Sequence, residues 1–298
     1  MSGGARMLFE LEWLGGATEH FYRRARPDAE RVPWGTIDAS RYAPDLLAAV
    51  RGAWTEVAMN EYRAVASFAE VVRALADAMA PLDMIGMASD FLADEVLHTE
   101  LAARVAMELG GAAPMEIDMG RFAVRADLDV TPGQRANELM LRVCCVGEAF
   151  AFGTGAPALK LPSHPLIKAV REIIMADEAR HARLGELWLA WASDAWDDAE
   201  RARLSRILER TLAGFRTFWS DEPGAVKDGI TSRGFRVEHL HELGWLESAR
   251  ATPLAREVAE ELLVPLARHG ITLSDEARLD LFGSSPIGTD PQAIAKCN

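Results

Sequence analysis

The chain contains little cysteine, and its cysteines are placed where they cannot build a disulfide framework. Of the three cysteines in 298 residues, Cys144 and Cys145 are adjacent and Cys297 is the penultimate residue. Small secreted proteins depend on several spaced cysteines, whereas a few free thiols are typical of a reducing compartment. We therefore expect a cytoplasmic protein whose fold depends on an ordinary apolar core.

Basic clusters and long uncharged apolar runs are also missing. The formal net charge is -13, and lysine and arginine nowhere form a run, which argues against a nucleic-acid-binding surface. Glu10 and Glu12 interrupt the apolar segment 8–14, so this segment lacks the core of a signal peptide. No uncharged apolar stretch approaches the length of a membrane span. We expect neither a nucleic acid nor a membrane as a partner.

Apolar residues instead recur at helical spacing in four long segments. These segments cover residues 45–80, 82–109, 131–153 and 165–193. Pro81 separates the first two, and Gly110-Gly111 ends the second. Thr131-Pro132 supplies an N-cap and a first helical residue for the third. The pattern predicts a core of four long helices.

The rest of the chain is expected to extend this core. Residues 112–130 are interpreted as a crossover connection, and the glycine-punctuated stretch 223–244 as a lid or a packing arm. Shorter helices are predicted over 198–219, 252–269 and 274–282. The prediction is an all-α protein with one domain over residues 1–298, divided into an N-terminal arm (1–42), a four-helix core (43–193) and a C-terminal helical extension (194–298).

Two copies of one short pattern, Asp-Glu-x-x-His, lie inside the predicted helices. Asp94-Glu95-Val96-Leu97-His98 lies in the second segment and Asp177-Glu178-Ala179-Arg180-His181 in the fourth. Glu and His three residues apart share one face of a helix. The first and third segments each add a lone glutamate among apolar residues, Glu61 and Glu148. Four carboxylates and two imidazoles that converge in a helix bundle would form a two-metal site.

Spacing alone is weak evidence, because composition predicts roughly 0.6 Glu-x-x-His pairs in a chain with 7 histidines. A third match, Glu238 with His241, lies in a short stretch without a lone-glutamate helix before it, and we do not expect it to bind metal. Glu56 competes with Glu61, but it lies about 140° around the helix and off the apolar stripe. The two main Glu-His pairs could also be buried ion pairs without any metal.

The doubled pattern with two lone glutamates resembles the ferritin-like di-iron carboxylate superfamily, in which two helices give one Glu each and two give Glu-x-x-His. The resemblance covers residues 43–193 and implies a ferritin-like four-helix bundle with additional N- and C-terminal helices. It implies two iron ions, Fe/Fe or Mn/Fe. The implied metal ligands are Glu61, Glu95, His98, Glu148, Glu178 and His181. Glu95 and either Glu148 or Glu178 are candidates for bridging the ions.

The resemblance also implies roles for residues next to these ligands. Asp94 and Asp177 are similar to the carboxylates that accept the free N–H of a ligating histidine, although a surface base such as Arg180 or Arg104 could pair with them instead. Cys144 and Phe152, each about one turn from Glu148, are candidates for a substrate pocket. The alternative is a core side chain, which for a small residue such as Cys144 is the preferred interpretation.

The superfamily resemblance favours an enzyme, because about 100 residues follow the fourth helix and about 40 precede the first. The chain is similar to acyl-carrier-protein desaturases and arylamine N-oxygenases. We expect an oxidoreductase that activates O2 to oxidise a small organic substrate, by hydroxylation, N-oxygenation or desaturation, with Glu148 and Glu178 as the catalytic residues. An electron donor, ferredoxin or a reductase, and a homodimer are implied. The alternatives are ferroxidase or iron handling without an organic substrate, and a purely structural bundle.

Overall fold

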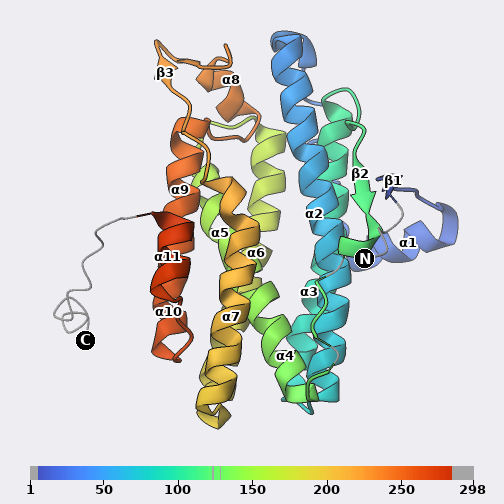
Figure 1. The fold of residues 1–298 in the computed structure, drawn as a ribbon. Helices are drawn as coiled ribbons and strands as arrows, with labels where there is room; N and C mark the ends of the chain where they lie inside the picture. Colours follow the sequence, from blue (N-terminus) through green and yellow to red (C-terminus); the bar gives the residue numbers. More distant parts are fainter. Residues whose placement is uncertain (1–5, 123, 128, 284–298) are drawn as a thin grey trace.

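The computed structural model describes residues 6–122, 124–127 and 129–283, and within these it is built mainly of long helices packed side by side (Figure 1). The expected all-α class is confirmed. The bundle consists of α2 (Pro44–Asp77), α3 (Leu82–Glu108), α4 (Pro132–Met140), a π-helical segment (Leu141–Glu148), α5 (Ala149–Gly155), a 3-10 turn (Ala156–Lys160) and α6 (Pro165–Ala192).

The ends of these helices agree with the local signals in the sequence. Gly110 and Gly111 follow α3 with φ values of 107° and 109°, a backbone region that suits glycine and stops the helix. Thr131 caps α4 in a capping box with Gln134, and Pro132 occupies the first turn. Pro165 likewise opens α6.

The third predicted helix differs from the expectation of one regular α-helix. It changes to a π-helix between Leu141 and Glu148, and then returns to an α-helix. α6 lies very close to this segment, because a Cβ added to Gly185 would sit 2.9 Å from the backbone nitrogen of Cys145. A wider turn changes which side chains face α6. The π-helical segment ends with Glu148 turned into the bundle, where it is buried.

The N-terminal arm is more ordered than its irregular sequence suggests. It contains β1 (Arg6–Leu8), α1 (Gly16–Ala25) and two 3-10 turns (Pro27–Arg31 and Ala39–Arg41). β1 pairs antiparallel with β2 (Glu116–Asp118) in the predicted crossover, which a further 3-10 turn (Met119–Arg121) follows. Ala29 and Val32 are buried in the core beside α3 and α6, so part of the arm belongs to the interior.

The C-terminal extension packs on the face formed by the π-helical segment, α5 and α6. Its elements are a 3-10 turn (Ser193–Ala195), α7 (Asp198–Phe215), a 3-10 turn (Arg216–Phe218), β3 (Val226–Lys227), β4 (Ile230–Thr231), α8 (Val237–Glu242), α9 (Ser248–Glu261), α10 (Leu263–Arg268) and α11 (Asp275–Phe282). The helix expected over 252–269 is interrupted after Glu261. Pro265 has no N–H for the carbonyl of Glu261, which explains the break. Leu204 and Leu212 of α7 share a core with Val146 and Phe150.

By length and composition, one stretch among the described residues, Pro132–Lys160, is apolar enough to cross a membrane. Half of its most apolar window is buried inside the protein, and core helices of soluble proteins pass the same test. The same stretch carries Glu148 into the bundle. The absence of a membrane partner stays a prediction.

Candidate metal centre

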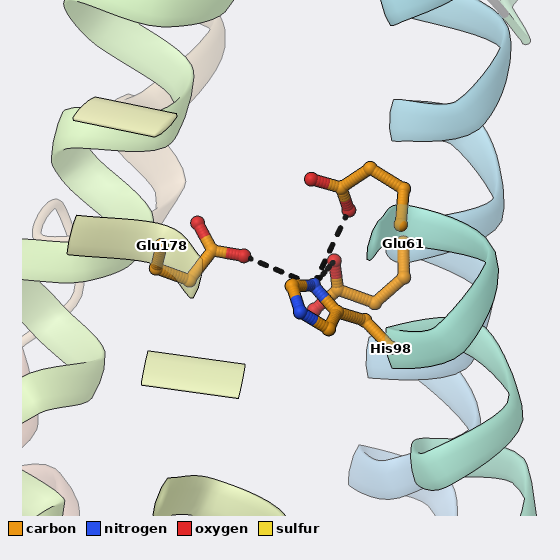
Figure 2. Close-up of side chains that lie close together, drawn as sticks. Glu61, His98 and Glu178 are labelled. Carbon is orange, nitrogen blue, oxygen red and sulfur yellow. Dashed lines mark ion pairs between the residues drawn. The ribbon is translucent and has the colours of Figure 1, made fainter. Parts of the chain in front are cut away.

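Six acidic and histidine side chains from the four helical segments meet inside the bundle. This six-residue cluster consists of Glu61 on α2, Glu95 and His98 on α3, Glu148 in the π-helical segment, and Glu178 and His181 on α6. Figure 2 shows Glu61, His98 and Glu178 pointing toward one another from three different helices. Residues that are far apart in the sequence are thus brought to one place by the bundle.

The cluster contains two overlapping groups of potential ligand atoms. The groups are Glu61, Glu95, His98 and Glu178, and Glu95, Glu148, Glu178 and His181; within each, one atom from every residue lies within 4.8 Å of the others. Glu95 and Glu178 belong to both groups. The side chains present could therefore hold two cations, with Glu95 and Glu178 as the shared ligands.

Both histidines turn the same ring nitrogen toward the carboxylates. His98 Nδ1 lies 3.4 Å from Glu178, 3.6 Å from Glu95 and 3.9 Å from Glu61. His181 Nδ1 lies 2.9 Å from Glu95 and 3.3 Å from Glu148. The two rings are 5.7 Å apart and tilted by only 33°. Each half of the cluster therefore presents one imidazole nitrogen among three carboxylates.

The other ring nitrogen of each histidine faces an aspartate of the opposite motif. His98 Nε2 lies 3.2 Å from Asp177, and His181 Nε2 lies 3.5 Å from Asp94. An aspartate on Nε2 holds the proton there and leaves Nδ1 free to bind a metal. The role that the family resemblance implies for these two aspartates needs this placement, and the role itself stays a prediction.

The alternative pairing of the aspartates with arginine is also present. Arg180 lies 2.5 Å from Asp177 and 3.1 Å from Asp94, and Arg26 of the N-terminal arm lies 3.0 Å from Asp94. Arg104 instead pairs with Glu30 and Glu100. One aspartate can accept from both a histidine and an arginine, so the two interpretations do not compete. Arg26 and Arg180 thus contact the same aspartates that face the histidine rings.

Without a metal, the cluster holds protons on several of its groups. Burial raises the pKa of Glu61 and that of Glu148 well above the usual value, and neighbouring carboxylates raise them further. Burial alone would lower the pKa of His181, but hydrogen bonds to Asp94, Glu148 and Glu95 raise it to about 12.

The two α3 residues of the cluster show the same balance. Burial would lower the pKa of His98, but hydrogen bonds led by that to Asp177 raise it well above the ordinary value. Burial would raise the pKa of Glu95, yet the two histidines lower it to about 2. Positive charge is thus required beside Glu95, and protonated rings supply it when no cation is bound.

Several atoms at the centre of the cluster lie close to oppositely charged groups but make no well-aligned hydrogen bond among the described residues. These atoms are both carboxylate oxygens of Glu95, Oε2 of Glu178 and Nδ1 of His98. Buried polar atoms are nearly always satisfied, so such a concentration needs an explanation. A cation bound by oxygen and imidazole nitrogen would satisfy all of them, and the donor set therefore fits a metal.

Aromatic rings enclose the His181 side of the cluster. Phe91 lies 4.3 Å from the His181 ring between centroids, and Phe68 lies 5.6 Å from it. Both phenylalanines are fully buried. An apolar wall keeps water from this side and strengthens the electrostatic interactions inside.

The rival residues lie elsewhere. Glu56 is exposed on α2. Glu238 is exposed at the surface beside Arg236, and His241 pairs with Glu247 at 2.8 Å. Neither Glu238 nor His241 belongs to a group of potential metal ligands in the part of the chain that the structure describes.

The two residues suggested for a substrate pocket have different surroundings. Cys144 is fully buried, and its Sγ lies 3.9 Å from Met140 Sδ. Phe152 is half-buried in α5. Two surface depressions are lined by other residues, one around the turn after α7, α9 and α11, and the other between the arm and α6, where it reaches Asp177. A role for Cys144 or Phe152 in a pocket stays a prediction.

Three contributors to the site were not found from the sequence. Arg26 comes from the arm, which has no clear periodicity, and Phe91 lacks any motif beyond its helical position four residues before Glu95. The π-helical turn that carries Glu148 has no established local signature. One feature of the sequence could have indicated the close approach of α6 to the π-helical segment. Cys144, Cys145 and Gly185 are small residues, and small residues on facing helices allow the helices to approach each other.

Comparisons with known proteins do not assign the chain to a family. No protein-family model matches it, and neither the curated proteins nor the solved structures contain a significant match. The function has to be inferred from the cluster itself.

Proposed function

We propose that the six-residue cluster holds two metal ions and that the protein is a di-iron oxygenase or oxidase with a ferritin-like core. The observation that carries the proposal is the concentration of unsatisfied buried ligand atoms at Glu95, Glu178 and His98, shared between two groups of four residues. A purely structural bundle would have little reason to retain them, because even paired charges are costly to bury when their hydrogen bonds are incomplete.

The charge of the cluster supports two divalent ions. Four carboxylates with two neutral imidazoles carry a charge of about -4, which two divalent cations balance. Mixed carboxylate and imidazole ligation suits iron or manganese better than metals that prefer thiolate, and the two cysteines nearest the cluster are not among its ligand groups. The proposal is therefore Fe/Fe, with Mn/Fe as the alternative occupancy.

When bound, a pair of iron ions supplies O2 binding and two-electron redox chemistry that side chains cannot provide. The residues of the chain would hold the ions in place and control access of water to them. Asp177 and Asp94 hold the proton on Nε2 of His98 and His181, so Nδ1 remains available. Phe91 and Phe68 exclude water from one side.

Glu148 is the ligand candidate placed best to respond to a substrate. It ends the π-helical segment, and π-helical turns occur frequently at functional sites. Its side chain keeps some exposure, 10%, whereas those of Glu95 and His98 are fully enclosed. The side chain of Glu61 is more exposed, 18%, but it lies on the regular helix α2 and not at a π-helical turn. We propose that the organic substrate is oxidised on the Glu148 side, with Glu148 and Glu178 as the catalytic carboxylates.

The proposal includes partners that the fold of one chain does not test. They are O2, a small organic substrate oxidised by hydroxylation, N-oxygenation or desaturation, and an electron donor such as a ferredoxin or a reductase. A homodimer, a cytoplasmic location and the absence of nucleic acid and membrane partners belong to the same proposal.

Metal analysis of the purified protein tests the first step. We expect about two ions of iron or of iron and manganese per chain, and a loss of metal in Glu178→Gln, because Glu178 belongs to both ligand groups. Glu56→Gln is the matched control on a bundle helix and should keep its metal. A protein that binds no iron or manganese at micromolar concentration would overturn the proposal.

Reaction with O2 tests the second step and separates the alternative. Iron-loaded, chemically reduced protein should consume O2 and convert members of an amine, alkane and acyl substrate panel. Rapid oxidation of excess Fe(II) without any organic product, together with assembly into a multi-subunit cage on a sizing column, would instead establish iron handling.

A further inference from the structure

The helix of the N-terminal arm, α1, has little apolar contact with the bundle. Figure 1 shows it outside the bundle, on the side of α3. None of its ten residues is buried, and Phe21 remains mostly exposed. A helix of this length is marginal alone in water, so α1 depends on the contacts that hold it in place. We call α1 together with the following Arg26 the strap (residues 16–26).

Two arginines of the strap hold it to α3 by ionic contacts. Arg23 pairs with Glu100, a buried residue of α3. Arg26 lies 3.4 Å from Asp90 and 3.0 Å from Asp94 of the same helix. Both arginine side chains are partly buried, so these pairs are less screened by solvent than pairs between fully exposed side chains.

One of these contacts leads to the six-residue cluster. Asp94 is almost completely buried, and its two oxygens face different groups. Oδ1 lies 3.0 Å from Nη1 of Arg26. Oδ2 lies 3.5 Å from Nε2 of His181 and 3.1 Å from Nη2 of Arg180. Two successive contacts therefore connect the strap to a candidate metal ligand.

The chain on either side of the strap is fixed in the fold. Before the strap, β1 pairs with β2, and after it Ala29 and Val32 are buried in the core. The arm does not seal its whole contact with α6, because the depression lined by Asp28, Val32 and Ile173 reaches Asp177 from the surface. The strap can therefore separate from α3 while both of its flanking segments stay attached.

We propose that the strap is coupled to the six-residue cluster through Arg26. The docked strap holds Asp94 in the position that orients His181 for a metal, and a bound metal in turn holds the strap on α3. Such coupling is reciprocal, so metal stabilises the docked strap by the same factor by which the docked strap strengthens metal binding. Arg26 is then a positioning residue that acts through Asp94.

The proposal rests on the proposed function for the presence of the metal. It adds a conformational response to it, because the state of a buried cluster would change the order of a helix at the surface. The sign follows from the geometry. An aspartate held on one oxygen by Arg26 keeps the other oxygen on His181, and losing the first contact frees the second.

Hydrogen exchange of the α1 amides in the full-length protein measures the docking. A detached α1 is too short to stay helical, so its amides exchange when the strap opens. Saturation with Mn²⁺, or with Fe²⁺ in the absence of O2, should slow this exchange by about fivefold or more. Arg26→Gln should remove the slowing and weaken metal binding by a similar factor in a chelator competition assay.

Two further variants separate the coupling from a merely structural role. Arg24→Gln changes an exposed arginine of the same helix and should alter neither the exchange nor the metal affinity. Arg23→Gln removes the pair with Glu100 but leaves Arg26 on Asp94. It should speed the exchange of α1 with and without metal, yet the slowing caused by metal should persist.

The outcomes distinguish a failure of the coupling from a failure of the metal site. Metal binding that leaves the exchange of α1 unchanged would overturn the coupling and keep the proposed function. The protein without substitutions gives this answer even if a variant fails to fold. Arg26→Gln that retains both the slowing and the affinity would overturn the coupling as well. Absence of Mn²⁺ and Fe²⁺ binding would overturn the proposed function and the coupling together.

Discussion

Metal loading should release protons, because the metal-free cluster stores them on its ligands. The pKa values of Glu61 and Glu148 are raised well above the ordinary value by burial. The pKa of His181 is about 12, and that of His98 is also well above its usual value. A metal that binds these two carboxyl groups and two imidazole rings must displace the protons that they hold, up to one from each group.

The expected magnitude follows from these groups. Two carboxyls and two rings can release up to about four protons for two divalent ions, and at that limit the buried charge is the same before and after loading. The sign of the pH dependence follows as well. Since protons compete with metal, the overall binding constant should rise with pH, by up to about four powers of ten per pH unit where all four groups are protonated.

Calorimetry of Mn²⁺ or anaerobic Fe²⁺ binding in buffers of different ionisation enthalpy measures the number of protons. Exposed acids contribute little, so Glu56→Gln should give the same number as the unchanged protein. Release of fewer than about two protons, or a binding constant that does not change between pH 6 and pH 8, would refute the account of the cluster.

Three further substitutions test separate parts of the structure. Asp94→Asn should weaken metal binding by about 10- to 100-fold in a chelator competition assay, because Asp94 faces His181 Nε2. Asp90 is the matched control, because it contacts Arg26 and Arg180, as Asp94 does, but no histidine. Asp90→Asn should therefore have little effect on metal binding. Gly185→Ala should destabilise the protein by about 1–3 kcal/mol in thermal unfolding, since its Cβ would meet the Cys145 backbone. Gly214 is exposed in α7 and has nothing within 4 Å of an added Cβ, so Gly214→Ala should stabilise the protein by about 0.5–1 kcal/mol. The opposite order of stabilities would contradict the close packing of α6 on the π-helical segment. Glu238→Gln should leave metal content unchanged, and a loss of metal would show that the third Glu-x-x-His had been misjudged.

The helices of the bundle were predictable because their limits are local. Proline and glycine at 81, 110, 132 and 165 act on the backbone within one turn, and the structure places the boundaries of α3 and α6 within one residue of the expected ones. The convergence of the six side chains was predictable for a related reason. A charged residue on an apolar stripe points into the core wherever the helix packs.

The π-helical segment was not predictable, because its cause is tertiary. Nothing in Leu141–Glu148 excludes a regular α-helix, and each residue type there is compatible with one. The approach of Gly185 to the backbone at Cys145 comes from α6, forty residues away. Helical phase calculated along a regular helix therefore fails for residues after this segment, which is why the surroundings of Phe152 could not be inferred from its spacing to Glu148.

The contacts of the aspartates change the meaning of the repeated motif. Along one helix Asp94 and His98 are four residues apart and could pair locally, and so could Asp177 and His181. The structure instead pairs Asp94 with His181 and Asp177 with His98, while Arg180 contacts both aspartates. Each half of the cluster is thus oriented by the other half. A neutral residue at one aspartate should therefore disturb the group of ligands centred on the opposite helix, and the two groups should lose metal together rather than one at a time.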